Sequence, residues 1–503
     1  MSVHRARLAR RAADGVGAVR STTHFRPPGG FVGDVIPFEK DGTVWLYYLL
    51  DTRDPRRPVD RDEGMPWAAV TTRDFATFAD RGAVLPSGGP AAEDFDCYTG
   101  SVVTDDDGLL HLFYTGHNPR IRTADGDAQV VCHATSGGDP AVWERHPEWT
   151  FGALDGYAPE DWRDPFVFRT APGEPWQMLL AARRQDAPYR RSGLVARLVS
   201  DDLVHWRDAE PLWDPRRFIA QECPDVFPWG DHWYLVYSEF SDSFQTRYRV
   251  ADSPEGPWRA PERDTVDGRA FYASKTVELD GERHFIGWIA SKEGESDAGA
   301  WQWAGTMAVL RAGQEADGSL SFGLPRAVSA LYDSVRDLRG DLTALDGTDA
   351  APGAGAIDRY AAWLGPRLSS ETLLVAEFDI APGTQACGLL LRASDDGEQA
   401  YVLRLEPQRD RLVFDRWPRG TTGGEQWQIR GDVPHAVELE RPVPLRPGRH
   451  TLEVQLDGDL CVAVVDDRVA LSTRVYDLTS GHVGVFATDG EFELVRLEAR
   501  TRS

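Results

Sequence analysis

Acidic residues stand at the start of three short segments whose other residues are mostly apolar. Asp34 lies in "GDVIPF", Asp164 follows Arg163 in "WRDPFVFR", and Glu222 opens "ECPDVFP". Two carboxyl groups can cleave a glycosidic bond, since one attacks the sugar or stabilises its cation while the other protonates the leaving oxygen. Asp-Pro is also common in turns, so only the joint placement of the three carboxylates indicates a site.

A weak internal repeat along the chain predicts that the three carboxylates lie close together. Its unit is an apolar strand, a turn with Gly or Asp, and a second strand rich in aromatic residues. The second strands read "TVWLYYL" (43–49), "LLHLFYT" (109–115), "PWQMLLA" (175–181), "HWYLVYS" (232–238) and "RHFIGWI" (283–289). Repeated β units of this size are typical of a β-propeller, and five units predict five blades.

The segment before each turn is then the innermost strand of its blade. The starting ends of these strands face one mouth of the central channel, so Asp34, Asp164 and Glu222 are expected to meet around one axial pocket. Three carboxylates so placed cannot all ionise cheaply, and one should hold its proton near neutral pH. Aromatic residues near the same strands are expected to form walls against which a sugar stacks: Tyr98, Trp162, Tyr272, Trp288 and Trp303.

The repeat stops near residue 330, and a different pattern follows. We predict a short disordered N-terminus over 1–20, a five-bladed propeller over 21–328, a linker over 329–364 and a β-sandwich over 365–503. The last range holds many short alternating strands with tight turns, among them "TLLVAEFDI", "AYVLRLE" and "HTLEVQLDG", as antiparallel sandwiches do. Helical periodicity is scarce, so the predicted fold class is all-β.

The acidic composition argues against nucleic acid and anionic membranes as partners. Asp and Glu outnumber Lys and Arg by 80 to 55, a formal charge of −25, and that field repels phosphate backbones. No apolar run has the length of a membrane-spanning helix, and no signal peptide pattern follows the early arginines. Five scattered cysteines indicate neither disulfides nor a zinc site. We therefore expect a cytoplasmic protein.

Neither a metal nor a cofactor is predicted. The acidic run "DDDG" at 105–108 matches the hairpin turns of the repeat better than a calcium-binding loop. The histidines lack the spacing of metal ligands. The expected partner is a carbohydrate substrate, a fructoside, and the sequence leaves the oligomeric state open.

Several segments, in this order along the chain, resemble glycoside hydrolase family 32, which includes invertases, levanases and inulinases. They are "GDVIPF", "DCYTGS", "WRDPFVF", "ECPDVFP", "FYASKT", "GWIA" and "WAGTMAVLRA". The resemblance covers nearly the whole chain and implies a five-bladed propeller with a C-terminal β-sandwich. It also implies hydrolysis of terminal β-D-fructofuranosyl linkages in sucrose, fructo-oligosaccharides or fructans, with retention of configuration.

Carried over to this sequence, the resemblance implies a role for each carboxylate. Asp34 would be the nucleophile that forms a covalent fructosyl-enzyme, and Glu222 the general acid/base. Asp164, with Arg163, would hold the sugar hydroxyls and stabilise the transition state. Further candidate substrate-binding residues are Tyr98, Thr99, Cys223, Tyr272, Trp288 and Trp303.

The nucleophile segment departs from the family pattern. Where the family usually has Asn-Asp-Pro-Asn-Gly, this chain reads Gly33-Asp34-Val35-Ile36-Pro37, so both asparagines are absent. Gly33, Val35 and Ile36 offer no side-chain hydrogen bond. We therefore expect the subsite next to the fructosyl pocket to be more apolar than that of an invertase, and sucrose to be a mediocre substrate.

Three other functions fit parts of the same pattern. A fructosyltransferase uses the same intermediate but excludes water. An inverting arabinofuranosidase or xylosidase on a five-bladed propeller needs carboxyl groups about 6.5–9.5 Å apart, and the Glu-Cys-Pro-Asp element speaks against it. A non-catalytic sugar-binding propeller remains the alternative outside enzymes, while the sandwich is expected to have a structural role.

Overall fold

The computed structural model describes residues 20–21, 23–52, 64–122, 126–347, 350–417 and 439–503. The predicted disordered N-terminus thus lies almost wholly outside the described residues. In the described part of the chain, strands dominate and the only α-helix is the five-residue α2 (Arg326–Ala330). The predicted all-β class is confirmed.

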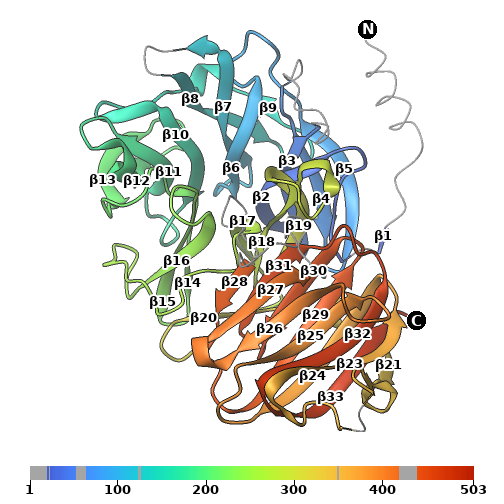
Figure 1. The fold of residues 1–503 in the computed structure, drawn as a ribbon. Helices are drawn as coiled ribbons and strands as arrows, with labels where there is room; N and C mark the ends of the chain where they lie inside the picture. Colours follow the sequence, from blue (N-terminus) through green and yellow to red (C-terminus); the bar gives the residue numbers. More distant parts are fainter. Residues whose placement is uncertain (1–19, 22, 53–63, 123–125, 348–349, 418–438) are drawn as a thin grey trace.

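Antiparallel meanders build the N-terminal domain (Figure 1). The first two contain β2 (Phe31–Lys40), β3 (Thr43–Asp51), β4 (Trp67–Thr72) and β5 (Thr77–Leu85), then β6 (Asp96–Thr104), β7 (Leu110–Arg122), β8 (Asp127–Ser136) and β9 (Glu144–Arg145). The third contains β10 (Tyr157–Phe168), β11 (Trp176–Arg184), β12 (Gly193–Ser200) and β13 (Arg207–Trp213). Then follow β14 (Glu222–Trp229), β15 (His232–Glu239) and β16 (Gln245–Ala251), and finally β17 (Phe271–Leu279), β18 (Glu282–Lys292), β19 (Trp301–Gln314) and β20 (Leu320–Gly323).

The first strands of the five meanders contact one another in a closed ring. Neighbours in this ring run β2, β6, β10, β14, β17 and back to β2. Strand pairing joins the first and last meanders into one sheet through the single pair Val32–Gly305, and it also attaches β1 (Arg20–Ser21) to β5. The ring supports the predicted count of five blades, and the propeller itself is the fold of this domain.

The acidic run at 105–108 forms a hairpin turn with the hydrogen bonds that its sequence predicts. At "DDDG", the Asp105 carboxylate accepts hydrogen bonds from the backbone N–H of Asp107 (3.0 Å) and Leu109 (2.8 Å), and Gly108 donates to the Asp105 carbonyl. Gly108 has φ of 85°, a left-handed conformation that favours glycine. The acidic run is therefore a turn, as expected.

Two sheets form the C-terminal sandwich. One has the order β21 (Ser334–Asp337), β33 (Phe492–Thr501), β24 (Glu371–Ile380), β29 (Gly448–Asp457), β30 (Leu460–Val465) and β31 (Val469–Arg474). The other has the order β22 (Thr343–Ala344), β23 (Ala356–Leu368), β32 (Gly481–Gly490), β25 (Ala386–Ala393), β26 (Ala400–Glu406), β27 (Arg411–Trp417) and β28 (Leu439–Pro442). β-Branched and leucine side chains from both sheets fill the space between them.

The predicted linker over 329–364 contains strands of this sandwich. β21 pairs with β33, β22 with β23, and β23 with β32. β21 and β22 are too short to show period-two alternation, and β23 shows none, because residues 357–360 are exposed and residues 361–365 are buried. We propose that the sandwich begins at β21 rather than at residue 365.

The sandwich packs on the last meander of the propeller through buried polar contacts. Arg474 is fully buried and donates to the carbonyls of Ala290 (2.9 Å) and Ile289 (2.7 Å) and to the Thr306 hydroxyl (2.9 Å). Buried charges need such partners, because an unpaired one costs several kcal/mol, roughly. These bonds fix the sandwich against β18 and β19, beside the last meander of the propeller (Figure 1).

Candidate active site

A β-bulge interrupts each of the five inner strands near its start. Pairing shifts by one residue between Val32 and Val35 in β2, and equivalent shifts follow at 98–100 in β6, 163–166 in β10, 222–225 in β14 and 272–275 in β17. A bulge bends the strand and re-aims a side chain. The bulged residues include Asp34, Thr99, Asp164 and Cys223, so the same irregularity turns predicted site residues toward the axis.

Asp34 has hydrogen-bond donors on both carboxylate oxygens. Thr99 Oγ1 donates to Oδ2 (2.5 Å) and Trp288 Nε1 donates to Oδ1 (2.9 Å). The Cys223 thiol also contacts Oδ2, at 3.5 Å. The donors come from β6, β14 and β18, so the orientation of Asp34 is set by three different strands.

Asp164 lies next to Asp34, and its carboxylate is held by the bulge of the next inner strand, β14. Its carboxylate accepts a 2.8 Å hydrogen bond from the backbone N–H of Cys223, the residue whose thiol contacts Asp34. Asp164 has φ of 61° and Cys223 of 52°, a left-handed conformation that costs free energy in non-glycine residues. The backbone N–H of Asp164 donates to Thr115 Oγ1 (2.8 Å), which helps to hold this conformation.

Glu222 completes the set of three carboxylates. Arg163 Nη2 donates to its Oε1 (2.9 Å) and the Tyr272 hydroxyl donates to its Oε2 (2.6 Å). Tyr272 in turn stacks on Phe244, with ring centroids 4.0 Å apart and planes 12° apart. The side chain of Glu222 is 21% exposed, whereas that of Asp164 is 4% exposed. Glu222 is therefore the more accessible to solvent of these two.

Burial dominates the electrostatics of the site. It raises the pKa of Asp34, while hydrogen bonds from Thr99 and Trp288 act in the opposite direction and the charge of Glu222 adds to the rise. Burial likewise raises the pKa of Asp164 against the effect of Arg163. For Glu222 burial raises the pKa, the Arg163 guanidinium lowers it, and Asp164 raises it further. Such shifts place a carboxylic acid where it can donate a proton near neutral pH.

The three carboxylates open into one cavity of about 460 Å³. Of the residues predicted to bind substrate, Arg163, Tyr98, Thr99 and Trp303 line it. Cys223, Tyr272 and Trp288 are almost fully buried and lie behind the carboxylates, to which they donate hydrogen bonds. The structure thus brings all ten predicted site residues together. Seven line the cavity, and the other three form a second layer behind the carboxylates.

Further lining residues were not predicted from the sequence. They are Leu49, Met65, Gln129, Asp161 and Phe240. Asp161 accepts a 2.7 Å hydrogen bond from Arg163 Nη1 and a 2.8 Å bond from Arg183 Nε. Its position three residues before Asp164, in the same inner strand, was the available signal.

Two expectations about side chains near the site are wrong. Trp162 does not form a wall, because it is fully buried and packs with Tyr157 in the core of the third meander. Val35 and Ile36 are also buried, at 0% and 1% exposure, in the packing around β2. Val35 and Ile36 point to opposite faces of β2 and pack in two different core clusters. Both faces of this strand are covered, so neither residue makes the next subsite apolar.

Gly33 has a different consequence from the one expected. A Cβ atom built there would lie 2.6 Å from one ring atom of Trp303 and 3.0 Å from Leu49 Cβ. Both neighbours line the cavity. The absence of a side chain at position 33 therefore makes room for the indole, which supplies apolar surface in its place.

No group of His, Cys, Asp and Glu in the described residues could hold a metal ion. Within those same residues, no helix is long and apolar enough to cross a membrane. All five cysteines lie in described segments, where they are buried and free of disulfides.

The fold and the site together define a protein in which a β-propeller with a carboxylate-lined axial cavity is joined to a β-sandwich. The chain belongs to glycoside hydrolase family 32. The model described as "Glycosyl hydrolases family 32 N-terminal domain" matches residues 24–320, and that described as "Glycosyl hydrolases family 32 C terminal" matches residues 344–501.

Curated relatives share modest sequence identity with this chain. Sucrose-6-phosphate hydrolase of Escherichia coli is 29% identical over 327 residues, which cover 59% of this chain and 62% of the relative, less than two thirds of its length. Sucrose-6-phosphate hydrolase of Zymomonas mobilis is 24% identical over 428 residues, which cover 78% of this chain and 76% of the relative.

Solved structures share the fold over almost the whole chain. Sucrose-6-phosphate hydrolase from Lactobacillus gasseri has a TM-score of 0.71 at 18% identity, covering 98% of this chain and 95% of that one. Fructan 1-exohydrolase IIa from Cichorium intybus, in complex with 1-kestose, has a TM-score of 0.73 at 16% identity, covering 96% and 98%. These likenesses bear on the fold, and the predicted propeller and sandwich are confirmed.

Proposed function

We propose that the protein is a retaining β-fructofuranosidase that releases terminal fructose from sucrose, fructo-oligosaccharides or related fructosides. The observation that carries the proposal is the hydrogen-bonded cluster of Asp34, Asp164 and Glu222 in one cavity of a family 32 chain. Relatives named as sucrose-6-phosphate hydrolases and β-fructofuranosidases support the same reaction.

In the proposed mechanism Asp34 is the nucleophile. Its carboxylate attacks the anomeric carbon of the fructosyl unit, and the bond to the leaving oxygen breaks. Thr99 and Trp288 hold the two oxygens of Asp34 (2.5 and 2.9 Å), so its orientation is set before substrate enters. Because these donors favour the charged form, they oppose the effect of burial on the pKa of Asp34 and keep a nucleophilic population.

Glu222 is the proposed general acid and base. Protonated, it gives its proton to the leaving oxygen; ionised, it then takes a proton from the water that cleaves the fructosyl-enzyme. Its raised pKa suits the first role, and the hydrogen bonds from Arg163 and Tyr272 suit the ionised form that follows. Glu222 must be protonated in the first step and ionised in the second, and these opposing effects on its pKa allow both forms.

Asp164 and Arg163 are the proposed binding groups for the sugar. Asp164 shares the cavity with Asp34 but receives a backbone N–H from Cys223, which holds it as an acceptor for hydroxyl groups. Arg163 is fixed by Asp161 and Glu222 at 2.7 and 2.9 Å. Both residues are therefore pre-oriented, which lowers the entropic cost of binding.

The cysteine chemistry supports a cytoplasmic location, which we propose together with this activity. Five buried, unpaired thiols are compatible with a reducing compartment, where disulfides are rare.

The proposal is tested by incubating the protein with sucrose, 1-kestose, levanbiose and an aryl β-fructoside and following products by NMR. The expected result is release of fructose whose first-formed anomer is β, as retention requires. Release of the α anomer would overturn the retaining mechanism. Failure to cleave any fructoside would overturn the activity, and fructosyl-extended products at high substrate concentration would identify a transferase.

A further inference from the structure

Phe240 is an aromatic side chain at the catalytic cavity that the proposed mechanism does not use. It lines this cavity and is 40% exposed. Single exposed apolar residues are common on protein surfaces and need no function. Phe240 differs from these, because it borders a cavity that holds reactive groups and because the loop that carries it is fixed.

Phe240 lies beside the proposed general acid. In the pairing of β14 with β15, Ser238 stands opposite Glu222, and Phe240 is the second residue after Ser238. It opens the connection from β15 to β16. Since Glu222 gives its proton to the leaving oxygen, a side chain in this place borders the leaving group of the substrate.

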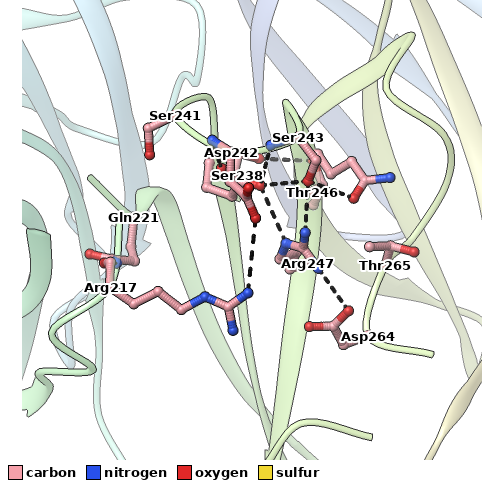
Figure 2. Close-up of polar contacts among 12 residues, drawn as sticks. Arg217, Gln221, Ser238, Ser241, Asp242, Ser243, Thr246, Arg247, Asp264 and Thr265 are labelled. Carbon is pink, nitrogen blue, oxygen red and sulfur yellow. Dashed lines mark hydrogen bonds and ion pairs between the residues drawn. The ribbon is translucent and has the colours of Figure 1, made fainter. Parts of the chain in front are cut away.

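The loop that carries Phe240 is fixed at its base. Glu239 is fully buried and accepts hydrogen bonds from the backbone N–H of Asp242 (2.9 Å) and Ser243 (3.1 Å). Arg247 Nη2 donates to Ser243 Oγ at 2.7 Å, and Figure 2 shows this network. Hydrogen bonds to an ionised group are stronger than neutral ones, so the base of the loop is preformed.

The other end of the same loop rests on the catalytic site. Phe244 stacks on Tyr272, with ring centroids 4.0 Å apart and planes 12° apart, and Tyr272 donates to Glu222. Phe240 is therefore presented by a loop that is anchored at both ends. Binding against its ring needs little ordering of the protein, which lowers the entropic cost.

The cavity lining outside the proposed catalytic and sugar-binding groups is mostly apolar or aromatic, namely Leu49, Met65, Tyr98, Phe240 and Trp303. Gln129 and Asp161 complete it, and both already accept protein donors. Gln129 accepts a 3.1 Å hydrogen bond from the backbone N–H of Trp162, and Asp161 accepts bonds from Arg163 (2.7 Å) and Arg183 (2.8 Å). Hydroxyl groups that leave water for an apolar surface lose hydrogen bonds, whereas an apolar face loses none.

We propose that Phe240 selects fructosides whose leaving group carries an apolar ring, of which benzyl alcohol is the simplest. The inference deepens the proposed function and rests on it, since only a fructosidase has a leaving group to select. A ring stacked on Phe240 removes apolar surface of both partners from water. Glu239 is then a positioning residue, which acts on the leaving group through the loop that it holds.

The test compares kcat/KM for benzyl and methyl β-D-fructofuranoside. The two leaving alcohols are nearly equal in acidity, so the ratio of the constants reports contact with the ring rather than ease of bond cleavage. We expect a preference for the benzyl fructoside of about tenfold or more in the wild type. Phe240→Ala should lower the ratio about tenfold, the lower end of the range for a lost apolar contact. Phe240→Trp should keep it, because an aromatic face remains.

Glu239→Gln tests the support of the loop. The amide keeps the size of the side chain but replaces one acceptor oxygen with a donor, so the bonds from Asp242 and Ser243 cannot all persist. The benzyl-to-methyl ratio should fall part of the way, through a higher KM for the benzyl fructoside rather than a lower kcat.

The matched control is Tyr360→Ala. Tyr360 is an aromatic residue of the sandwich that is 54% exposed, and the ratio should be unchanged without it. Equal constants for the two fructosides in the wild type overturn the inference. So does a Phe240→Ala variant that keeps the ratio, or a control that lowers it as much.

Binding separates this inference from the proposed function. Isothermal titration of Asp34→Asn with the benzyl and methyl fructosides needs no turnover. Tighter binding of the benzyl fructoside that disappears in Asp34→Asn, Phe240→Ala supports the role of Phe240 even if the wild type cleaves no fructoside. Cleavage of both fructosides without a difference in affinity or in kcat/KM leaves the proposed function intact and overturns the inference. Neither cleavage nor binding overturns both.

Discussion

The catalytic cavity and a second cavity among loops, called the arginine cavity because Arg190, Arg191, Arg216 and Arg217 line it, are nearly equal in volume, about 460 and 470 Å³. The two are opposite in charge. The catalytic cavity is lined by four carboxylates and one arginine, and the arginine cavity by four arginines and one carboxylate. The β15–β16 connection separates the mainly acidic cavity from the mainly basic one, since Phe240 lines the first and Ser241 lines the second. The difference lies in how each set is supported.

The catalytic groups belong to bulged inner strands, and each carboxylate receives donors from neighbouring strands. The arginines belong to connections and are largely exposed. Groups that react must be held within a fraction of an ångström, since a misplacement of about 1 Å can cost about 10²-fold in rate. Loops vary at less cost to the fold, so side chains on connections tolerate the exposure that the reacting groups on the strands do not.

Asp34→Asn should cause the largest loss of activity of all the variants. The amide cannot form the fructosyl-enzyme, so kcat should fall on the order of 10⁴-fold or more for every fructoside tested. Circular dichroism and the melting temperature should show a folded protein. Asp201→Asn, an exposed carboxylate at the far end of the third meander, is the control, and near-normal activity of Asp34→Asn would refute the nucleophile assignment.

Glu222→Gln should remove the acid and base function while leaving the nucleophile. In the wild type the rate rises as Asp34 ionises and falls as Glu222 loses its proton, and the raised pKa of both groups places this bell above the range of ordinary carboxyls. In the variant kcat for sucrose should drop by about 10²–10⁴-fold and the basic limb should disappear.

Fructosyl fluoride, whose leaving group needs no proton, should lose far less in the first step with Glu222→Gln. A pH–rate profile on both substrates measures this. An unchanged basic limb in the variant would mean that another group supplies the proton.

Gly33→Ala should displace Trp303 and so disturb the border of the catalytic cavity. The added methyl would lie 2.6 Å from the indole, a contact that requires a shift of the ring. We expect kcat/KM to fall by about 10²-fold and the melting temperature to drop, as overpacking costs about 1–3 kcal/mol. The double variant Gly33→Ala, Trp303→Phe should recover part of the stability. Additive losses in the double variant would show that the two sites are independent.

Tyr272→Phe should have the smallest effect, on the pH profile more than on the rate. Its hydroxyl donates to Glu222 at 2.6 Å and stabilises the ionised carboxylate, so its removal raises the pKa of Glu222 further. The basic limb should therefore move to higher pH, with a loss in kcat/KM of about tenfold, the value of a hydrogen bond to a charged group. Tyr47→Phe, a buried tyrosine that donates to the carbonyl of Pro140, should leave the basic limb in place.

Much of the site could be predicted because residues at equivalent positions of the propeller repeat lie close together around the central axis. Asp34, Asp164 and Glu222 occupy equivalent places in three repeats, and the structure brings them together as expected. Trp162 was misplaced because the side chain next to Arg163 points to the opposite face of β10. Gln129 and Phe240 come from a third strand and a connection, where the repeat carries no signal for function.

The sequence by itself determined the all-β class, the repeat, and the position of the three carboxylates at the starts of equivalent strands, because strand alternation and turn chemistry are local properties. Only the tertiary structure decided that Gly33 makes room for Trp303, that Cys223 bridges Asp34 and Asp164, and that the arginines of two connections share one cavity. These contacts join residues far apart in the chain. They depend on bulge geometry and the closure of the ring, which no short stretch of sequence encodes.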